Sequence, residues 1–251
     1  MNYLLTPFRI AYKFYYFIYV GLALIITYPF FYFLLSDPKR FPYAFKMMRW
    51  FSIAWQAFAL VPVRVKGREN ILSHGSFIIC ANHTSYMDIP VTYCVFKKYF
   101  VFVAKREVES WPLFKIFFTS KINITVDRES GSGSIEAFKQ MMEEIDKGHP
   151  LAIYPEGTIS RLAPEMLDFK PGAFSIAIRK QIPILPVTFV TNWRRLQRNK
   201  KWTARAGPGV SEVIIHKPVN TVGLSKKDSD ALSLKVKNTI YAPLKERYAF
   251  E

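Results

Sequence analysis

The feature that most constrains this chain is a run of 22 residues without a charged side chain, which extends from Phe14 to Leu35. A hydrocarbon layer of roughly 30 Å is crossed by about 20 apolar residues in a helix, so this run is long enough to lie in a membrane. Aromatic side chains gather at both of its ends and leave Val20 to Thr27 free of rings, as in the interfacial belts of membrane segments. We therefore expect this segment to contact lipid.

A second uncharged run, from Trp50 to Pro62, has 13 residues and is too short to span a membrane. Two arrangements stay open: one crossing followed by an interfacial helix, or a helical hairpin that dips into one leaflet and turns at residues 36–38. We favour the hairpin, because it keeps every charge on one side, and expect residues 1–62 to form a membrane-associated arm. A cleavable signal peptide and a buried core helix fit less well, because the first run is long and carries five tyrosines.

Residues 63–251 have the pattern of an α/β domain. Half of the whole chain is hydrophobic, which is ample for a buried core despite a formal net charge of +16. Helical patterns cover about Ser134 to Lys147 and about Lys226 to Tyr241, and we expect the second helix to end near Pro243. Alternation of such patterns with short apolar runs predicts a mixed sheet with flanking helices. The expected strands are residues 77–81, 100–104, 122–126, 151–154, 184–189 and 213–216.

A histidine and a carboxylate, His83 and Asp88, follow the first of these strands directly. Ligands of open α/β sheets bind beyond the carboxyl ends of the strands. Five positions lie about 140° apart on a regular helix, so the two side chains can meet only if a turn capped by Thr84 or Ser85 precedes the helix. A carboxylate on one imidazole nitrogen makes the other a better proton acceptor. A structural role is the alternative, because Ser85 and Asp88 also fit a capping box.

A second polar cluster, Glu156 to Arg161, follows the strand at residues 151–154. Gly157 permits a tight turn, Thr158 supplies a hydroxyl, and Arg161 offers a planar fork of donors suited to phosphate or carboxylate. Such a loop can hold an anion, although an ordinary loop between a strand and a helix has the same composition.

Two more cations stand at strand ends, Lys105 and Arg128. Carboxyl ends of parallel strands meet at one edge of a sheet, so these cations could converge with His83 and Arg161 there. Each cation alone could equally be a solvated surface charge.

Four pieces of the sequence, NHTSYMD, INITVDR, YPEGTISR and ILPV, occur in this order between residues 77 and 190. Together they resemble the four sequence blocks of the glycerolipid acyltransferase family, whose first block is N-H-x-x-x-x-D and whose third is E-G-T. In length and in its hydrophobic arm, the chain is similar to the bacterial lysophosphatidic acid acyltransferases.

The resemblance implies that His83 is a general base and that Asp88 orients it. The acyl acceptor and its phosphate would be bound by residues of the second and third blocks, to which we add Lys105 because it stands at a strand end. The expected binding residues are Lys105, Arg128, Glu156, Gly157, Thr158 and Arg161.

The implied reaction moves a fatty acyl chain from a thioester of coenzyme A or acyl carrier protein to the sn-2 hydroxyl of lysophosphatidic acid. The product is phosphatidic acid, an intermediate of phospholipid biosynthesis. We expect neither a metal nor a cofactor besides the acyl donor. A lipid acceptor accounts for the apolar arm, so we expect the protein at the cell membrane with its catalytic domain on the cytoplasmic face.

Three alternatives stay open. A sibling acyltransferase would use glycerol 3-phosphate, another lysophospholipid or a lipid A precursor. Covalent catalysis is disfavoured, because the chain has no G-x-S-x-G elbow and Cys80 lies inside a predicted strand. A membrane-anchored basic binding protein is the non-enzyme alternative, since residues 194–205 are basic with Trp202 among them. An anionic headgroup or an acidic carrier protein explains this segment as well, and we expect no nucleic acid partner.

Overall fold

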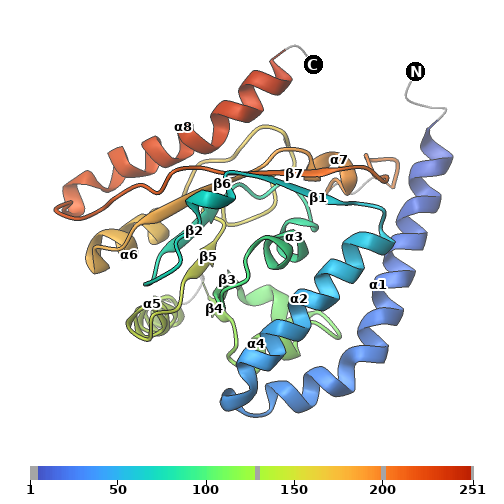
Figure 1. Cartoon of the computed structure of the whole chain (residues 1–251), viewed down its shortest axis with the longest axis horizontal. Helices are drawn as coiled ribbons and strands as arrows, with labels where there is room; N and C mark the ends of the chain where they lie inside the picture. The colour runs from blue at the N-terminus through green and yellow to red at the C-terminus, as the bar shows by residue number, and fades with distance from the viewer. Residues whose placement is uncertain (1–4, 128–130, 199–201, 250–251) are drawn as a thin grey trace.

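The computed structural model describes residues 5–127, 131–198 and 202–249 (Figure 1). The chain begins with two long helices, α1 (Thr6–Leu35) and α2 (Phe41–Phe58), which form a hairpin. A short 3₁₀ turn at Pro38–Arg40 joins them, and Asp37 caps it by accepting a hydrogen bond from the amide of Lys39. The other described α-helices are α3 (Asp88–Val95), α4 (Ile116–Thr119), α5 (Gly131–Asp146), α6 (Gly172–Lys180), α7 (Asn192–Arg195) and α8 (Ser229–Tyr248).

A seven-stranded sheet forms the centre of the molecule, with the strand order β1-β7-β6-β2-β5-β3-β4. Among the strands that the structure describes, β6 and β7 are the one antiparallel pair, so the sheet is mixed. The predicted α/β class with a mixed sheet is confirmed, and all six expected strands are present. The strands are β1 (Val63–Lys66), β2 (Ile78–Ala81), β3 (Val101–Lys105), β4 (Ile124–Val126), β5 (Leu151–Ile153), β6 (Ile184–Phe189) and β7 (Ser211–Ile215).

Helices cover both faces of this sheet, so the central strands are buried on both sides. In β2, Ile79 and Ala81 pack with the layer of α1, α2 and α3, whereas Ile78 and Cys80 pack with α5, α6 and α8. Alternate residues of a strand point to opposite faces, which explains why every residue of β2 is apolar. Cys80 is a fully buried core residue, as predicted.

The first helix, α1, is apolar all round its circumference from Phe14 onward. Its inner side packs on the rest of the protein through residues about four apart, from Tyr12 and Tyr16 to Val20 and Leu24. Its outer side exposes large apolar side chains such as Ile26, which is 69% exposed. By length and composition α1 could cross a membrane. A helix that meets only water on its outer side would carry polar residues there.

The last helix differs from its prediction. We expected it to end near Pro243, but α8 runs through this residue to Tyr248. Tertiary contacts outweigh the hydrogen bond that a proline cannot make. Leu244 is buried, and the Tyr248 hydroxyl donates a hydrogen bond of 2.9 Å to the carbonyl of Val190.

Candidate active site

Three neighbouring parallel strands, β6, β2 and β5, end at the same edge of the sheet. Asn82, the first residue after β2, joins two of these ends. Its side chain accepts a hydrogen bond of 2.7 Å from the amide of Phe189 and donates one of 3.1 Å to the carbonyl of the same residue. Because both ends are tied together, the loop that follows Asn82 starts from a fixed position.

His83 and Asp88 meet across the turn between β2 and α3. The Nδ1 atom of His83 lies 2.8 Å from Oδ2 of Asp88, which is the first residue of α3. The same oxygen accepts hydrogen bonds from the backbone amides of Thr84 (2.6 Å) and Ser85 (2.8 Å). The Ser85 hydroxyl accepts a bond from the amide of Met87, so the predicted turn before the helix is present. The carboxylate accepts only, so Nδ1 carries the proton and Nε2 has a free lone pair.

Asp88 is fully buried, and a residue from another part of the chain completes its surroundings. The side-chain amide of Asn192, in α7 after β6, donates a hydrogen bond of 2.8 Å to Oδ1 of Asp88. Asn192 is itself oriented by the hydroxyl of Ser211, which donates to its side-chain oxygen over 2.6 Å. Ionised buried carboxylates need such donors, so Asn192 stabilises the charged form of Asp88.

The imidazole ring of His83 rests on Tyr154, the first residue after β5. The two rings stack with centroids 4.2 Å apart and an interplanar angle of 14°. Burial raises the pKa of the Tyr154 phenol, whose hydroxyl lies 3.0 Å from that of Thr92. The His83 side chain is 12% exposed, and its Nε2 makes no hydrogen bond with any residue that the structure describes. A substrate hydroxyl could therefore reach Nε2.

Glu156 holds His83 by its backbone. One carboxylate oxygen accepts a hydrogen bond of 2.7 Å from the amide of His83, and the other accepts one of 2.8 Å from the amide of Leu167. Burial raises the pKa of Glu156 to about 7, although both amide bonds lower it. The nearby charge of Asp88 adds a smaller increase. Both oxygens of Glu156 are thus engaged by the protein, so this residue supports His83.

The rest of the Glu156 loop turns at Gly157, whose φ of 70° lies in the left-handed region that glycine adopts readily. The hydroxyl of Thr158 accepts a hydrogen bond of 2.7 Å from Nη1 of Arg198. Arg198 is half-buried and follows β6 and α7 in the chain, so a third loop reaches the site. We did not predict this residue as part of the site.

Two of the three predicted cations, Arg161 and Lys105, are described by the structure, and their surroundings differ. Arg161 is exposed and makes no hydrogen bond or ion pair with the described residues. Lys105, at the end of β3, pairs with Glu107 at 2.9 Å, and its side chain is 41% exposed. Arg128 lies outside the described residues. The neighbouring Asp127 pairs with Arg106 at 2.8 Å.

The structure therefore brings together His83, Asp88 and Glu156, and it places Thr158 beside Arg198. Sequence reasoning missed Tyr154, Asn192 and Arg198. One sequence signal points to Asn192, because a polar residue shortly after a buried strand occupies the same kind of position as His83. Within the described part of the chain, no three His, Cys, Asp or Glu side chains gather as metal ligands.

Comparison with known proteins agrees with this geometry. The profile of the protein family described as "Acyltransferase" matches residues 62–190, which is more than half of the chain. This chain belongs to the acyltransferase family. The matched range contains β1 to β6 and both loops that hold His83. The resemblance seen in the sequence blocks is thus confirmed at the level of the family.

Curated members of this family are named 1-acyl-sn-glycerol-3-phosphate acyltransferase. The one from Saccharomyces cerevisiae is 31% identical over 186 residues, which are 73% of this chain and 60% of that protein. The one from Helicobacter pylori is 31% identical over 118 residues, 47% of this chain and 50% of that protein. The matched part thus spans about half to three fifths of these relatives' own length.

A solved structure is similar over the whole length of this acyltransferase-family chain. It is the crystal structure of the 1-acyl-sn-glycerophosphate (LPA) acyltransferase PlsC from Thermotoga maritima, with a TM-score of 0.72 and 25% sequence identity. The superposition covers 100% of this chain and 99% of that one, so the likeness includes the α1–α2 hairpin.

Proposed function

We propose that this chain transfers a fatty acyl group from a thioester of coenzyme A or acyl carrier protein to the sn-2 hydroxyl of lysophosphatidic acid. One observation carries the proposal: His83 is bonded through Nδ1 to a fully buried carboxylate and keeps Nε2 free. The names of the relatives supply the substrate class, because they describe acyl transfer to 1-acyl-sn-glycerol 3-phosphate.

The pair of His83 and Asp88 suits the difficult step of this reaction. A secondary alcohol hardly ionises at neutral pH, so Nε2 removes its proton while the oxygen attacks the thioester carbonyl. The tetrahedral intermediate then collapses and the carbon–sulfur bond breaks. The departing thiolate takes from Nε2 of the imidazolium the proton that came from the alcohol. Asp88 stabilises the positive charge on the ring in between. The products are phosphatidic acid and the free thiol.

The phosphate of the acceptor would be held by the cations at this edge of the sheet. Arg161 is exposed and can form bidentate, charge-assisted bonds with a phosphate. Lys105 stands at the neighbouring end of β3, and Arg128 is expected to take part as well. Gly157 and Thr158 shape the loop that presents Arg161, and Glu156 fixes His83 relative to that loop. Correct orientation of the hydroxyl can supply much of the remaining rate acceleration.

Membrane association belongs to the same proposal. Lysophosphatidic acid and phosphatidic acid are lipids, and the outer side of α1 exposes apolar side chains along the whole helix. We propose that residues 1–62 attach the domain of residues 63–251 to the cytoplasmic face of the cell membrane. The net positive charge would favour an anionic bilayer surface.

Activity assays with the purified chain test the proposal directly. Several lysolipids and glycerol 3-phosphate are offered with acyl-coenzyme A and with acyl carrier protein thioesters. We expect transfer to lysophosphatidic acid, and a loss of about 10³-fold or more in kcat for His83→Ala. Cys80→Ala should keep substantial turnover, because Cys80 is a core residue. If neither donor supports transfer to any lysolipid, the proposal is wrong. Preference for another acceptor would overturn only the choice of substrate.

A further inference from the structure

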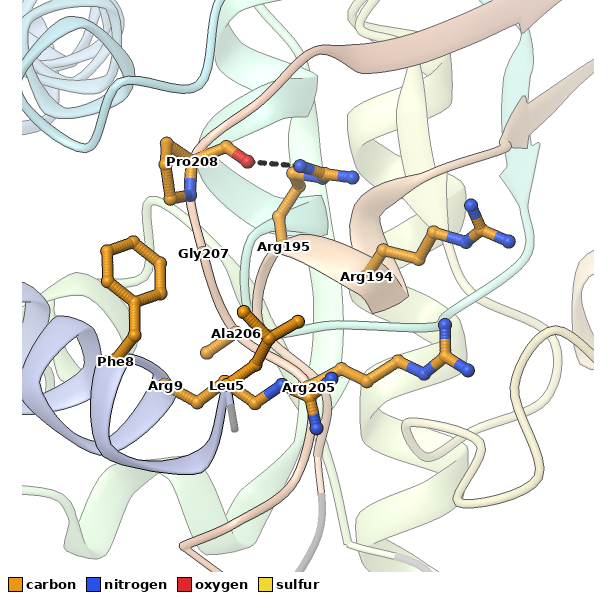
Figure 2. Close-up of a pocket in the computed structure, with 9 residues that line it drawn as sticks. All are labelled: Leu5, Phe8, Arg9, Arg194, Arg195, Arg205, Ala206, Gly207 and Pro208. Atoms are coloured by element: carbon orange, nitrogen blue, oxygen red, sulfur yellow. Dashed lines mark hydrogen bonds between the residues drawn. The ribbon is translucent and has the colours of Figure 1, made fainter. Parts of the chain in front are cut away.

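A cavity of about 310 Å³ lies between the start of α1 and residues 194–195 and 205–208 (Figure 2). Four of the residues that line it are arginines, and none of its described lining residues is acidic. The remaining lining residues are apolar or glycine, and none of the residues discussed for the candidate active site lines it. We call it the arginine pocket; its arginines are Arg9, Arg194, Arg195 and Arg205.

Contacts with the protein hold three of these arginines in place, namely Arg194, Arg195 and Arg205. The guanidinium groups of Arg194 and Arg205 lie over the buried ring of Trp193, at 5.2 and 4.9 Å from its centre. Arg195 donates a hydrogen bond to the carbonyl of Pro208 (Figure 2), while its buried Nε has no partner among the described residues. Burial and the neighbouring Arg194 lower the pKa of Arg195. A cluster of fixed, partly desolvated cations is a strong site for an anion.

The pocket opens beside the exposed apolar side of α1. Leu5 and Phe8 belong to its lining and are 53% and 54% exposed. Nearly two turns further along α1, Phe14 stacks on Trp202 with ring centroids 4.9 Å apart, and Trp202 is 50% exposed. The amine of Lys13 donates to the carbonyl of Trp202 over 2.8 Å. The cations therefore lie next to a surface that suits acyl chains.

We infer that the arginine pocket binds the phosphate of a membrane phospholipid, with the acyl chains of the lipid along the outer side of α1. This inference rests on the proposed function only in assuming that the chain works at a membrane. The arginine pocket, with a volume of about 310 Å³, can hold a single phospholipid headgroup. Nucleic acid or an acidic protein helix would need an extended charged surface, whereas this site is concave and has apolar walls.

The test uses phosphatidylmethanol, an anionic phospholipid without a hydroxyl group to acylate, so that it is neither acceptor nor product of the proposed reaction. The purified full chain in detergent micelles is titrated with this lipid and observed by native mass spectrometry. We expect one tightly bound lipid per chain and much weaker binding of zwitterionic phosphatidylcholine. Arg205→Gln and Arg9→Gln should each weaken binding about ten-fold, because a charge-assisted bond is lost. Arg205→Lys should cause a smaller loss.

Two matched controls remove the same charge elsewhere. Arg179→Gln changes an exposed residue of α6, and Arg161→Gln changes the candidate active site; both should bind phosphatidylmethanol as the wild type does. Equal loss in all four glutamine variants, or no loss with Arg205→Gln, would refute the site. Displacement of the lipid by equimolar inorganic phosphate or glycerol 3-phosphate would show that the arginine pocket binds free phosphate, and the assignment to a phospholipid would be wrong. Transfer activity is measured separately, so lipid binding without transfer contradicts only the proposed function.

Discussion

The loop after β2 and the loop after β5 each hold His83 through a buried carboxylate, but the two carboxylates differ in their hydrogen-bond donors. Asp88 binds the ring and receives four hydrogen bonds of 2.6 to 2.8 Å, from His83, Thr84, Ser85 and Asn192. Glu156 accepts hydrogen bonds from only two backbone amides, those of His83 and Leu167, and burial raises its pKa to about 7. The two buried carboxylates thus differ in what they bind: Asp88 contacts the ring that would accept the proton, whereas Glu156 contacts only backbone amides among these partners.

The largest difference between the two loops should appear in Asp88→Asn. The carboxamide keeps the size of the side chain, but it cannot stabilise the imidazolium and it favours the wrong tautomer of His83. We expect kcat for acyl transfer to fall about 10²- to 10⁴-fold. Thermal unfolding of the variant serves as the control for folding. A fall in kcat of less than about three-fold would show that Asp88 takes no part in the reaction.

Glu156→Gln should act on stability and its pH dependence. Between about pH 4.5 and 7 the folded state binds more protons at Glu156 than the unfolded state, so its contribution to stability falls as pH rises. The fall is at most ~3 kcal/mol. Glutamine cannot titrate. Its side-chain NH₂ group also cannot accept one of the two hydrogen bonds that Glu156 receives from the backbone amides of His83 and Leu167. We therefore expect the variant to be less stable than the wild type at pH 5 and the gap to shrink by pH 8.

Thermal unfolding at pH 5, 6, 7 and 8 measures this gap. Glu69→Gln, which changes an exposed carboxyl group near β1, is the matched control and should show a constant difference from the wild type. Parallel curves for Glu156→Gln and the wild type would show that the Glu156 carboxyl is already ionised at pH 5.

A smaller effect is expected for Asn192→Leu, which removes one donor from Asp88. We expect kcat to fall about ten-fold, because a buried hydrogen bond to a charged group is lost. Asn123→Leu is the matched control, since Asn123 is also buried and its side chain bonds the backbone of Phe102 and Phe117, away from Asp88. An equal fall in kcat in both variants would mean that Asn192 acts on stability alone.

The smallest effect should come from Arg198→Gln, which frees the hydroxyl of Thr158. This change loosens the loop after β5 without touching His83, so we expect KM for the lysolipid to rise about three- to five-fold with little change in kcat. Arg179→Gln, on the surface of α6, should leave KM unchanged. A fall in kcat larger than the rise in KM would instead place Arg198 at the reacting atoms.

Sequence reasoning predicted the parts of the site that depend on local structure. His83 and Asp88 are five residues apart, and the turn that brings them together is encoded by the residues between them. Asn192 and Arg198 were not predicted, because they contact residues 104 and 40 positions away and nothing in the local pattern links them. Such contacts follow from the order of strands in the sheet, which a single sequence leaves open.

The fold shows the same division. Six strands were predicted from their apolar runs, whereas β1 was not, because its four residues alternate between half-buried valines and exposed cations at the sheet edge. Pro243 misled the prediction of α8, since contacts of Leu244 and Tyr248 keep the helix intact beyond it. Local sequence rules fail at those strands and helix ends whose structure is decided by packing against distant parts of the chain.

The position of β1 has a consequence for how the protein is made. β1 follows the α1–α2 hairpin directly, yet within the described sheet its one partner is β7, with Val63 opposite Ser211. A ribosome delivers the hairpin and β1 long before β7. The α1–α2 hairpin is thus complete while the adjoining strand β1 still lacks its partner, and the sheet can form in full only after β7 has been synthesised.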